Sequence, residues 1–376
     1  MTKKILRRGI IIVGIILIGG LGGIIADRYV FPYLSSTEIF KKYAFLKKGS
    51  EDITIINKTE QVFVKEETSI AKISNQASAS VVGIIYYDAN NKLAVKYGTG
   101  LIVTSDGLIM SYADIPSAAN LKYKVIMADG ANYEAEVQGR DNYSNLFFLK
   151  INVGNLPVVS FGNSDDIKSG EKMIAIGTAP SSFDHEYAAG LISNFNATYN
   201  LAGKAVASSE KLEGVFEMDV NVKQDYVGGP VVDYMGQVIG VIGVNAVDNA
   251  QKFFILPSNK IAGVVSRAIK KELDLDPILG IYYVSLTKSH TLINNSKDEQ
   301  GALIFSASGQ QGLAIIAGSP AQKAGLQLND IITKINDQAI NTANPLSDLL
   351  YRSKKGDTIN LTVLRGDQEL SISVQL

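Results

Sequence analysis

The stretch KYGTGLIVTSDGLIMSYA, residues 96–113, contains two apolar, β-branched runs on either side of a short polar turn. The turn is Ser105–Gly107, and its glycine supplies the positive φ that a hairpin turn needs. Similar short runs, separated by Gly, Asp and Asn, recur on both sides of this stretch, from Ser69 to the run VIGVIGV at 238–244. Strands of this length and spacing predict an all-β barrel or sandwich rather than βαβ units.

The last third of the chain has a different pattern. Residues 256–276 place apolar side chains at helical spacing, which predicts an amphipathic helix that closes the all-β part: Ile261, Val264, Val265 and Ile269. Beyond Asp276 the strand-like runs ILGIYYVSL and DIITKIN alternate with the helical segments GSPAQKAGL and NPLSDLLYRS, and two further strand-like runs follow. This alternation predicts a small, independent α+β domain.

The N-terminus combines basic residues with a long apolar run. Residues 9–26, GIIIVGIILIGGLGGIIA, carry no charge and follow four basic side chains: Lys3, Lys4, Arg7 and Arg8. About 18 or more apolar residues can span a bilayer, and a basic flank stays on the cytoplasmic side. The pattern predicts an uncleaved transmembrane anchor at 9–26 with the rest of the chain outside the cytoplasm. A cleaved signal peptide is the alternative.

Composition excludes several classes of chemistry. Lys plus Arg number 36 and Asp plus Glu 37 over 376 residues, so no net field recruits nucleic acid. The chain has no cysteine, which removes disulfides, thiolate catalysis and cysteine-based metal sites. We expect no metal and no cofactor. The only histidines, His185 and His290, are predicted to be surface residues.

Five motifs, in order, resemble the HtrA family of serine proteases. They are GTGLIVTSDGLIMS (98–111), GRDNYSNLFFLKI (139–151), FGNSDDIKSGEKMIAIGTAP (161–180), GLISNF (190–195) and MDVNVKQDYVGGPVVDYMGQVIGVI (218–242). The resemblance implies a mostly β fold: a trypsin-like double six-stranded β-barrel followed by an α+β PDZ domain, behind an N-terminal transmembrane helix. It covers all but the anchor and the stalk that follows it.

The same resemblance places unusual residues at the catalytic positions. Where the family reads TNxHV this chain reads SYADI, which puts Asp114 at the histidine position. Asn145 stands at the aspartate position, and DYVGGP replaces GNSGGP, with Val227 at the nucleophile and Asp225 in the oxyanion loop. Valine has no lone pair, an amide cannot stabilise an imidazolium, and a carboxylate opposes an oxyanion. The sequence therefore predicts a pseudoprotease. Tyr226, Lys223 and Ser144 lie nearby, but none has a partner that would make it a nucleophile.

The PDZ-like part keeps the features of a peptide-binding module. Such domains add an extended peptide to a sheet edge and capture its terminal carboxylate with backbone N–H groups. The resemblance assigns that loop to Leu279, Gly280 and Ile281, and the opposite wall to Leu346 with Leu349 or Leu350. The alternative for the leucines and Ile281 is that they pack the domain core. Gly325 is predicted to end a short helix and Leu326 to pack.

The resulting prediction has five segments: a cytoplasmic basic segment at 1–8, the anchor at 9–26, a stalk at 27–68, the double barrel at 69–275 and the PDZ domain at 276–376. The predicted function is an extracytoplasmic, bacterial, membrane-anchored pseudoprotease that binds peptide or unfolded-protein C-termini in protein quality control. The family implies a homotrimer or co-assembly with an active paralogue. An active endopeptidase with unusual residues and a purely structural envelope scaffold are the alternatives.

Overall fold

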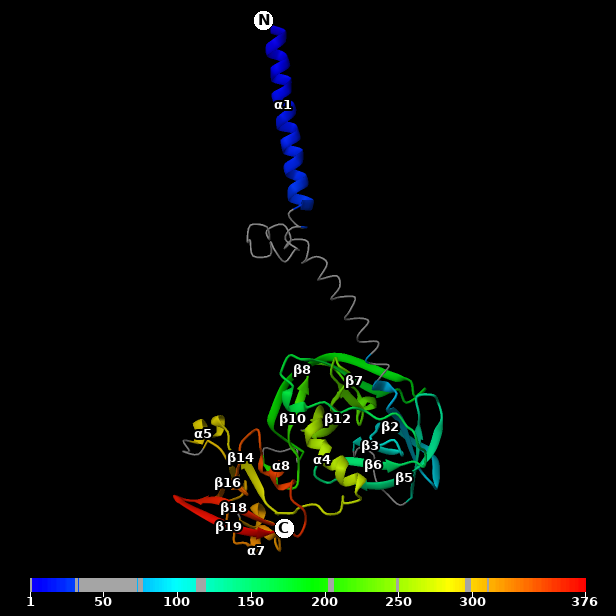
Figure 1. Ribbon diagram of the computed structural model, residues 1–376. Helices are drawn as coiled ribbons and strands as arrows, with labels where there is room; N and C mark the ends of the chain where they lie inside the picture. Colours follow the sequence, from blue (N-terminus) through cyan, green and yellow to red (C-terminus); the bar gives the residue numbers. More distant parts are fainter. Residues whose placement is uncertain are drawn as a thin grey trace. The chain divides into compact units, whose positions relative to one another are not determined.

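The computed structural model describes residues 2–30, 33, 73, 77–112, 120–201, 206–247, 250–294, 299–309 and 311–376. Asp114 and nearly all of the predicted stalk therefore lie outside the described residues. The chain divides into two compact units, residues 1–71 and 72–376. In the first unit, α1 (Thr2–Ile25) and a π-helical turn (Ala26–Val30) occupy the segment of the predicted anchor (Figure 1). Among the described residues, no helix has both the length and the apolar character needed to cross a membrane.

The second unit begins with a closed six-stranded barrel in the order β1-β2-β3-β6-β5-β4. Its strands are β1 (Val81–Asp88), β2 (Asn91–Ile102), β3 (Leu108–Tyr112), β4 (Leu121–Ile126), β5 (Asn132–Arg140) and β6 (Leu146–Lys150). The predicted hairpin is confirmed, since Gly107 has φ +98° and joins β2 to β3. A Cβ there would come within 2.3 Å of the Ile151 carbonyl oxygen, so the turn requires glycine.

A second closed six-stranded barrel follows in the order β10-β13-β12-β11-β7-β8. Its strands are β7 (Lys172–Thr178), β8 (His185–Asn200), β10 (Glu213–Met218), β11 (Pro230–Val232), β12 (Val238–Val247) and β13 (Ala250–Pro257). The predicted closing helix is α4 (Ser258–Ile269), which lies against β12 and β13 (Figure 1). Ile261, Val264 and Val265 are buried as expected, but Ile269 is 54% exposed, because the helix ends at that residue.

The C-terminal α+β domain has a sheet in the order β19-β18-β16-β15-β14, with β17 beside β16. Its strands are β14 (Tyr282–Ser285), β15 (Ala302–Ile304), β16 (Ile331–Ile335), β17 (Gln338–Ala339), β18 (Thr358–Arg365) and β19 (Gln368–Gln375). Its helices are α5 (Lys288–Asn294), α6 (Gln311–Ala314), α7 (Pro320–Lys323) and α8 (Leu346–Leu350). As predicted, Gly325 follows α7 with φ +79° and Leu326 is buried.

One strand crosses between the barrel region and the C-terminal domain. β9 (Ala207–Ser208) lies in the chain between β8 and β10, yet it pairs antiparallel with β14 and becomes the edge of that domain's sheet. The sequence did not predict this strand. Two residues carry too little periodicity to be recognised, and their partner lies more than seventy positions away.

Candidate functional site

The turn that carries Val227 is tightly packed between the two barrels. It consists of a 3-10 turn, η4 (Gln224–Tyr226), followed by Val227, whose side chain is buried, and by Gly228 with φ +85°. A Cβ on Gly228 would come within 2.3 Å of Ser111 Oγ and 2.4 Å of the Thr99 carbonyl oxygen. Thr99 Oγ1 also donates to the Asp225 carbonyl oxygen, at 2.6 Å. The turn therefore has a packing role that does not depend on a nucleophile.

The backbone N–H groups of Val227 and Gly228 are already hydrogen-bonded within the protein. Val227 N–H donates to the Gln224 carbonyl at 3.0 Å, and Gly228 N–H donates to the Ile242 carbonyl at 2.9 Å. Oxyanion stabilisation needs N–H donors aimed at the place where the substrate oxygen will develop charge. The N–H at the nucleophile position is instead used to close η4. This geometry offers no donor from Val227 to a substrate.

Asn145, at the expected aspartate position, has neutral and basic neighbours. Its backbone has φ 58°, its Nδ2 donates to Tyr112 Oη at 3.4 Å, and its Oδ1 accepts from Lys211 Nζ at 3.3 Å. Burial lowers the pKa of Lys211, with a further contribution from Arg140. Tyr112 lies near both Asn145 and the turn that carries Val227. Its hydroxyl accepts from Asn145, and a Cβ on Gly228, the residue after Val227, would lie 3.0 Å from its backbone nitrogen.

Neither histidine lies in an exposed loop. His185 is the first residue of β8 and is half-buried, with Nε2 3.2 Å from the Val81 carbonyl oxygen. His290 is half-buried on α5. The loop placement was therefore wrong for both, because the sequence around each histidine is loop-like, whereas both side chains stay partly exposed at the surface.

The loop Leu279–Ile281 presents its N–H groups in one direction. The carbonyl oxygens of Leu279 and Gly280 accept from Ala321 N–H and Ile316 N–H, at 3.0 and 2.9 Å. Gly280 has φ +83°, which turns the backbone so that consecutive N–H groups form an anion-binding concavity. A Cβ on Gly280 would lie 2.3 Å from Ser319 Cβ, so the position requires glycine.

A carboxylate from the barrel region occupies this concavity. Glu210 Oε1 accepts from Leu279 N–H at 3.1 Å and from Gly280 N–H at 2.8 Å, while Ser209 Oγ accepts from Ile281 N–H at 3.1 Å. Sequence reasoning missed Glu210 and Ser209, because nothing local in SSEK connects them to a loop seventy residues away. The assignment of Leu279–Ile281 as the peptide-binding loop stays a prediction. The loop's N–H groups bind a carboxylate, as that role would require.

The predicted apolar pocket residues belong to the core of the domain. Leu279, Ile281, Leu346 and Leu349 are all buried and share one cluster with Ala207 of β9. Their burial in this cluster fits both interpretations, a role in the domain core and a role in the wall of a ligand pocket. Their contact with a ligand stays a prediction.

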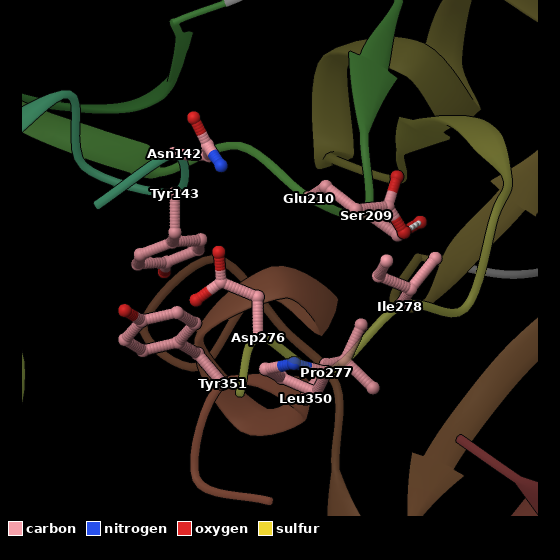
Figure 2. A pocket seen from close by; sticks show the side chains of 9 residues that line it. All are labelled: Asn142, Tyr143, Ser209, Glu210, Asp276, Pro277, Ile278, Leu350 and Tyr351. Carbon is pink, nitrogen blue, oxygen red and sulfur yellow. Dashed lines mark hydrogen bonds between the residues drawn. The ribbon is translucent and has the colours of Figure 1, made fainter. Parts of the chain in front are cut away.

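Beside the loop, the barrel region and the C-terminal domain enclose a cavity of about 210 Å³ (Figure 2). On one side Ser209 and Glu210 lie close to Ile278, and on the other the rings of Tyr143 and Tyr351 stack with centroids 4.0 Å apart. Tyr143 donates to Asp348 on α8, and Tyr351 donates to Asp141. The candidate peptide loop therefore lies in the contact between the barrel region and the C-terminal domain.

Comparisons with known proteins agree with this architecture. The model of the trypsin-like peptidase domain matches residues 89–241, and that of the PDZ domain matches 277–376. The putative serine protease HhoB of Synechocystis sp. is 29% identical over 278 residues, which cover 74% of this chain and 65% of HhoB. The serine protease Do-like HtrA of Bacillus subtilis is 25% identical over 339 residues, covering 87% of this chain and 74% of the relative. The chain is similar to HtrA-type serine proteases over both domains.

Solved structures support the fold of the HtrA-like chain. The HtrA-type protease AlgW with a tripeptide superposes with a TM-score of 0.64 at 22% identity, covering 81% of this chain and 95% of AlgW. AlgW with a decapeptide gives 0.61 at 20% identity, with 81% and 97% covered. The chain spans 65% of HhoB and 59% of the serine protease HTRA1 of Xenopus tropicalis, which is 29% identical to it. The predicted mostly β fold, two six-stranded barrels and a PDZ domain, is confirmed.

Glu213 makes the contact between the second barrel and the PDZ domain sensitive to pH. Its buried carboxylate accepts from Tyr283 Oη at 2.7 Å and from Ser285 Oγ at 3.0 Å. Burial raises the pKa of Glu213 from 4.5 to about 7, against the lowering effect of these hydrogen bonds. Between these two values the folded state holds a proton that the unfolded state releases, so the free energy of unfolding falls as pH rises.

We expect Glu213→Gln to flatten this dependence, because the amide cannot ionise. The wild-type chain should lose up to roughly 3 kcal/mol of unfolding free energy between pH 4.5 and 8 through this group. Urea unfolding at several pH values measures the difference. Glu217→Gln is the matched control, since hydrogen bonding to Asn196 lowers the pKa of Glu217. An equal slope in wild type and Glu213→Gln would contradict the assignment.

Proposed function

We propose that this HtrA-like chain is a pseudoprotease that binds the free C-termini of peptides or unfolded proteins through its PDZ domain. The observation that carries the proposal is the convergence of the Leu279 and Gly280 N–H groups on a carboxylate oxygen, at 3.1 and 2.8 Å. This is the chemistry that captures a terminal carboxylate in peptide recognition. The proposal also includes a role in envelope protein quality control, as a homotrimer or together with an active paralogue. This part rests on the resemblance to HtrA-type proteases.

Two features of the barrel site support the absence of proteolysis. Val227 provides no nucleophilic atom, and its N–H is bonded to the Gln224 carbonyl at 3.0 Å. Asn145 is bonded to Tyr112 and Lys211 rather than to an imidazole. The third position, Asp114, enters the proposal from the sequence alone. The competing function, an active endopeptidase, requires a serine in the site to react.

The wild-type chain should not react with a fluorophosphonate probe, because valine and not serine stands at position 227. Val227→Ser should also remain unlabelled, since the new hydroxyl would lie beside an N–H that already closes η4 and would lack a base. Gel fluorescence against an active HtrA-type protease measures the labelling. Stoichiometric labelling of the wild-type chain would establish the endopeptidase instead.

Peptide binding should depend on the free carboxylate and on Gly280. We expect a peptide with an apolar free C-terminus to bind the full chain, and its amidated counterpart to bind at least about tenfold more weakly. Gly280→Ala should abolish binding, because its Cβ would lie 2.3 Å from Ser319 Cβ and the loop would shift. Fluorescence anisotropy with labelled peptides measures both effects.

Gly366→Ala is the matched control for Gly280→Ala. Gly366 also has a positive φ, +61°, in the same domain, but an added Cβ would have no atom within 4 Å. Gly366→Ala therefore introduces the strain of an alanine at positive φ, as Gly280→Ala does, but it does not displace the loop Leu279–Ile281. If peptides with free and amidated C-termini bind equally, the proposed recognition of free C-termini by the PDZ domain is wrong, and a structural envelope scaffold explains the chain better.

The proposal includes a membrane anchor at residues 9–26 with the folded domains outside the cytoplasm. Its support is the uncharged apolar run after four basic residues. We expect the full chain, expressed in a bacterium, to stay in the membrane pellet after alkaline carbonate extraction. Replacing Ile15 and Leu17 by Lys should release it, while Lys at the loop residues Asn155 and Val158 should not. Release of the wild-type chain would contradict the anchor.

A further inference from the structure

β9 occupies the edge of the PDZ sheet where a peptide would add. Ser208 pairs with Tyr282 and Ala207 with Tyr283, so β9 is the outermost strand beside β14. The next residue continues the pairing, because Ser209 N–H donates to the Ile281 carbonyl at 3.0 Å. Peptides bound by β-augmentation use the same backbone groups of an edge strand. β9 therefore satisfies the hydrogen bonds that an incoming peptide would make.

The direction of this segment is that of a peptide whose C-terminus ends in the loop. From Ala207 to Glu210 the chain runs antiparallel to β14 and arrives at Leu279 and Gly280. Because the chain continues to Lys211, the carboxylate at the end comes from the Glu210 side chain. Ser209 Oγ lies 2.6 Å from Glu210 Oε1, and Ser208 Oγ donates to Oε2 at 3.1 Å. Both oxygens are thus held, as in a bound terminal carboxylate.

The residues that follow fasten the segment to the barrel. Lys211 Nζ donates to the Asn142 carbonyl at 2.7 Å, and Leu212 N–H donates to the Tyr143 carbonyl at 3.0 Å. The backbone carbonyl of Glu213 accepts from Lys260 Nζ at 2.7 Å. Because the chain is fastened to the barrel directly after Glu210, the segment is positioned beside the PDZ loop without the full entropy cost that a free peptide carries.

We infer that Ala207–Glu210 is an internal ligand of the PDZ domain, and that a partner with a free C-terminal carboxylate binds by displacing it. This inference rests on the proposed function and adds its regulation. Only the fraction of molecules with the segment released is competent, so the apparent dissociation constant exceeds the intrinsic one by the inverse of that fraction. The occupied state is the ground state of the chain in the absence of a partner.

Removing the internal carboxylate should raise the affinity for an external one. We expect full-length Glu210→Gln to bind a free-C-terminus peptide at least about tenfold more tightly than wild type, because a neutral amide competes poorly for two N–H donors. Glu217→Gln, on β10 and bonded to Lys252 and Asn196, is the matched control with unchanged affinity. Fluorescence anisotropy gives the three dissociation constants.

A disulfide tests the same inference by locking the segment in place while Glu210 is kept. The chain has no cysteine, and Ser208 and Tyr282 are directly opposed across the β9–β14 pair, a placement compatible with a disulfide. Oxidised Ser208→Cys/Tyr282→Cys should lose peptide binding, and a reductant should restore it. Peptide binding that is equal in the oxidised and reduced states would overturn the internal ligand.

The outcomes separate the two proposals. If wild type and Glu210→Gln bind the peptide equally and the disulfide has no effect, the PDZ function stands and the internal ligand is refuted. If no form binds, including Glu210→Gln and the reduced double variant, the PDZ function fails and the internal ligand fails with it. Tighter binding by Glu210→Gln together with loss of binding on oxidation supports both.

Discussion

Carboxylates at the boundary between the barrels and the PDZ domain hold the two together. Four of them accept hydrogen bonds from across that boundary: Asp141 from Tyr351, Asp348 from Tyr143 and Lys260, Glu213 from Tyr283 and Ser285, and Glu210 from the Leu279 and Gly280 N–H groups. Asp141 and Glu213 are buried, and a buried carboxylate that loses its hydrogen-bond partners while it stays buried costs several kcal/mol, so these contacts oppose small displacements of the domains. The position of the PDZ loop relative to the barrel follows from this constraint.

The boundary also connects the two candidate sites through consecutive residues. Glu210 is bonded to the loop Leu279–Ile281, Lys211 is bonded to Asn145 at the predicted aspartate position, and Glu213 is bonded to β14. Lys211 Nζ also donates to the Asn142 carbonyl at 2.7 Å, so the residue that follows Glu210 is bonded to the first barrel. The loop Leu279–Ile281 and Asn145 are therefore joined through two adjacent residues, Glu210 and Lys211.

Much of the fold was predictable because it is encoded locally. Hairpin turns such as Ser105–Gly107, the helix at Ser258–Ile269 and the glycine after α7 are determined by neighbouring residues, and the structure has them where the sequence predicts them. β9 and the stack of Tyr143 on Tyr351 were not predictable, since each depends on residues separated by seventy or more positions. The candidate site divides in the same way. Val227 and Gly280 are identified by their local motifs, whereas Glu210 has no motif.

The glycines after Val227 show why a motif alone cannot separate an enzyme from an inactive relative. A Cβ on Gly228 would collide with Ser111 and Thr99 of the first barrel, and one on Gly229 would lie 2.0 Å from the Ile176 carbonyl oxygen. The Gly228 contacts join the two barrels, and both positions require glycine whether or not peptides are cleaved. Peptide-bond cleavage depends instead on two further features, the side chain at position 227 and the availability of its backbone N–H to donate to the substrate. Here the first is an isopropyl group and the second is bonded to the Gln224 carbonyl, which supports the proposal that the loop keeps its architecture for packing and not for catalysis.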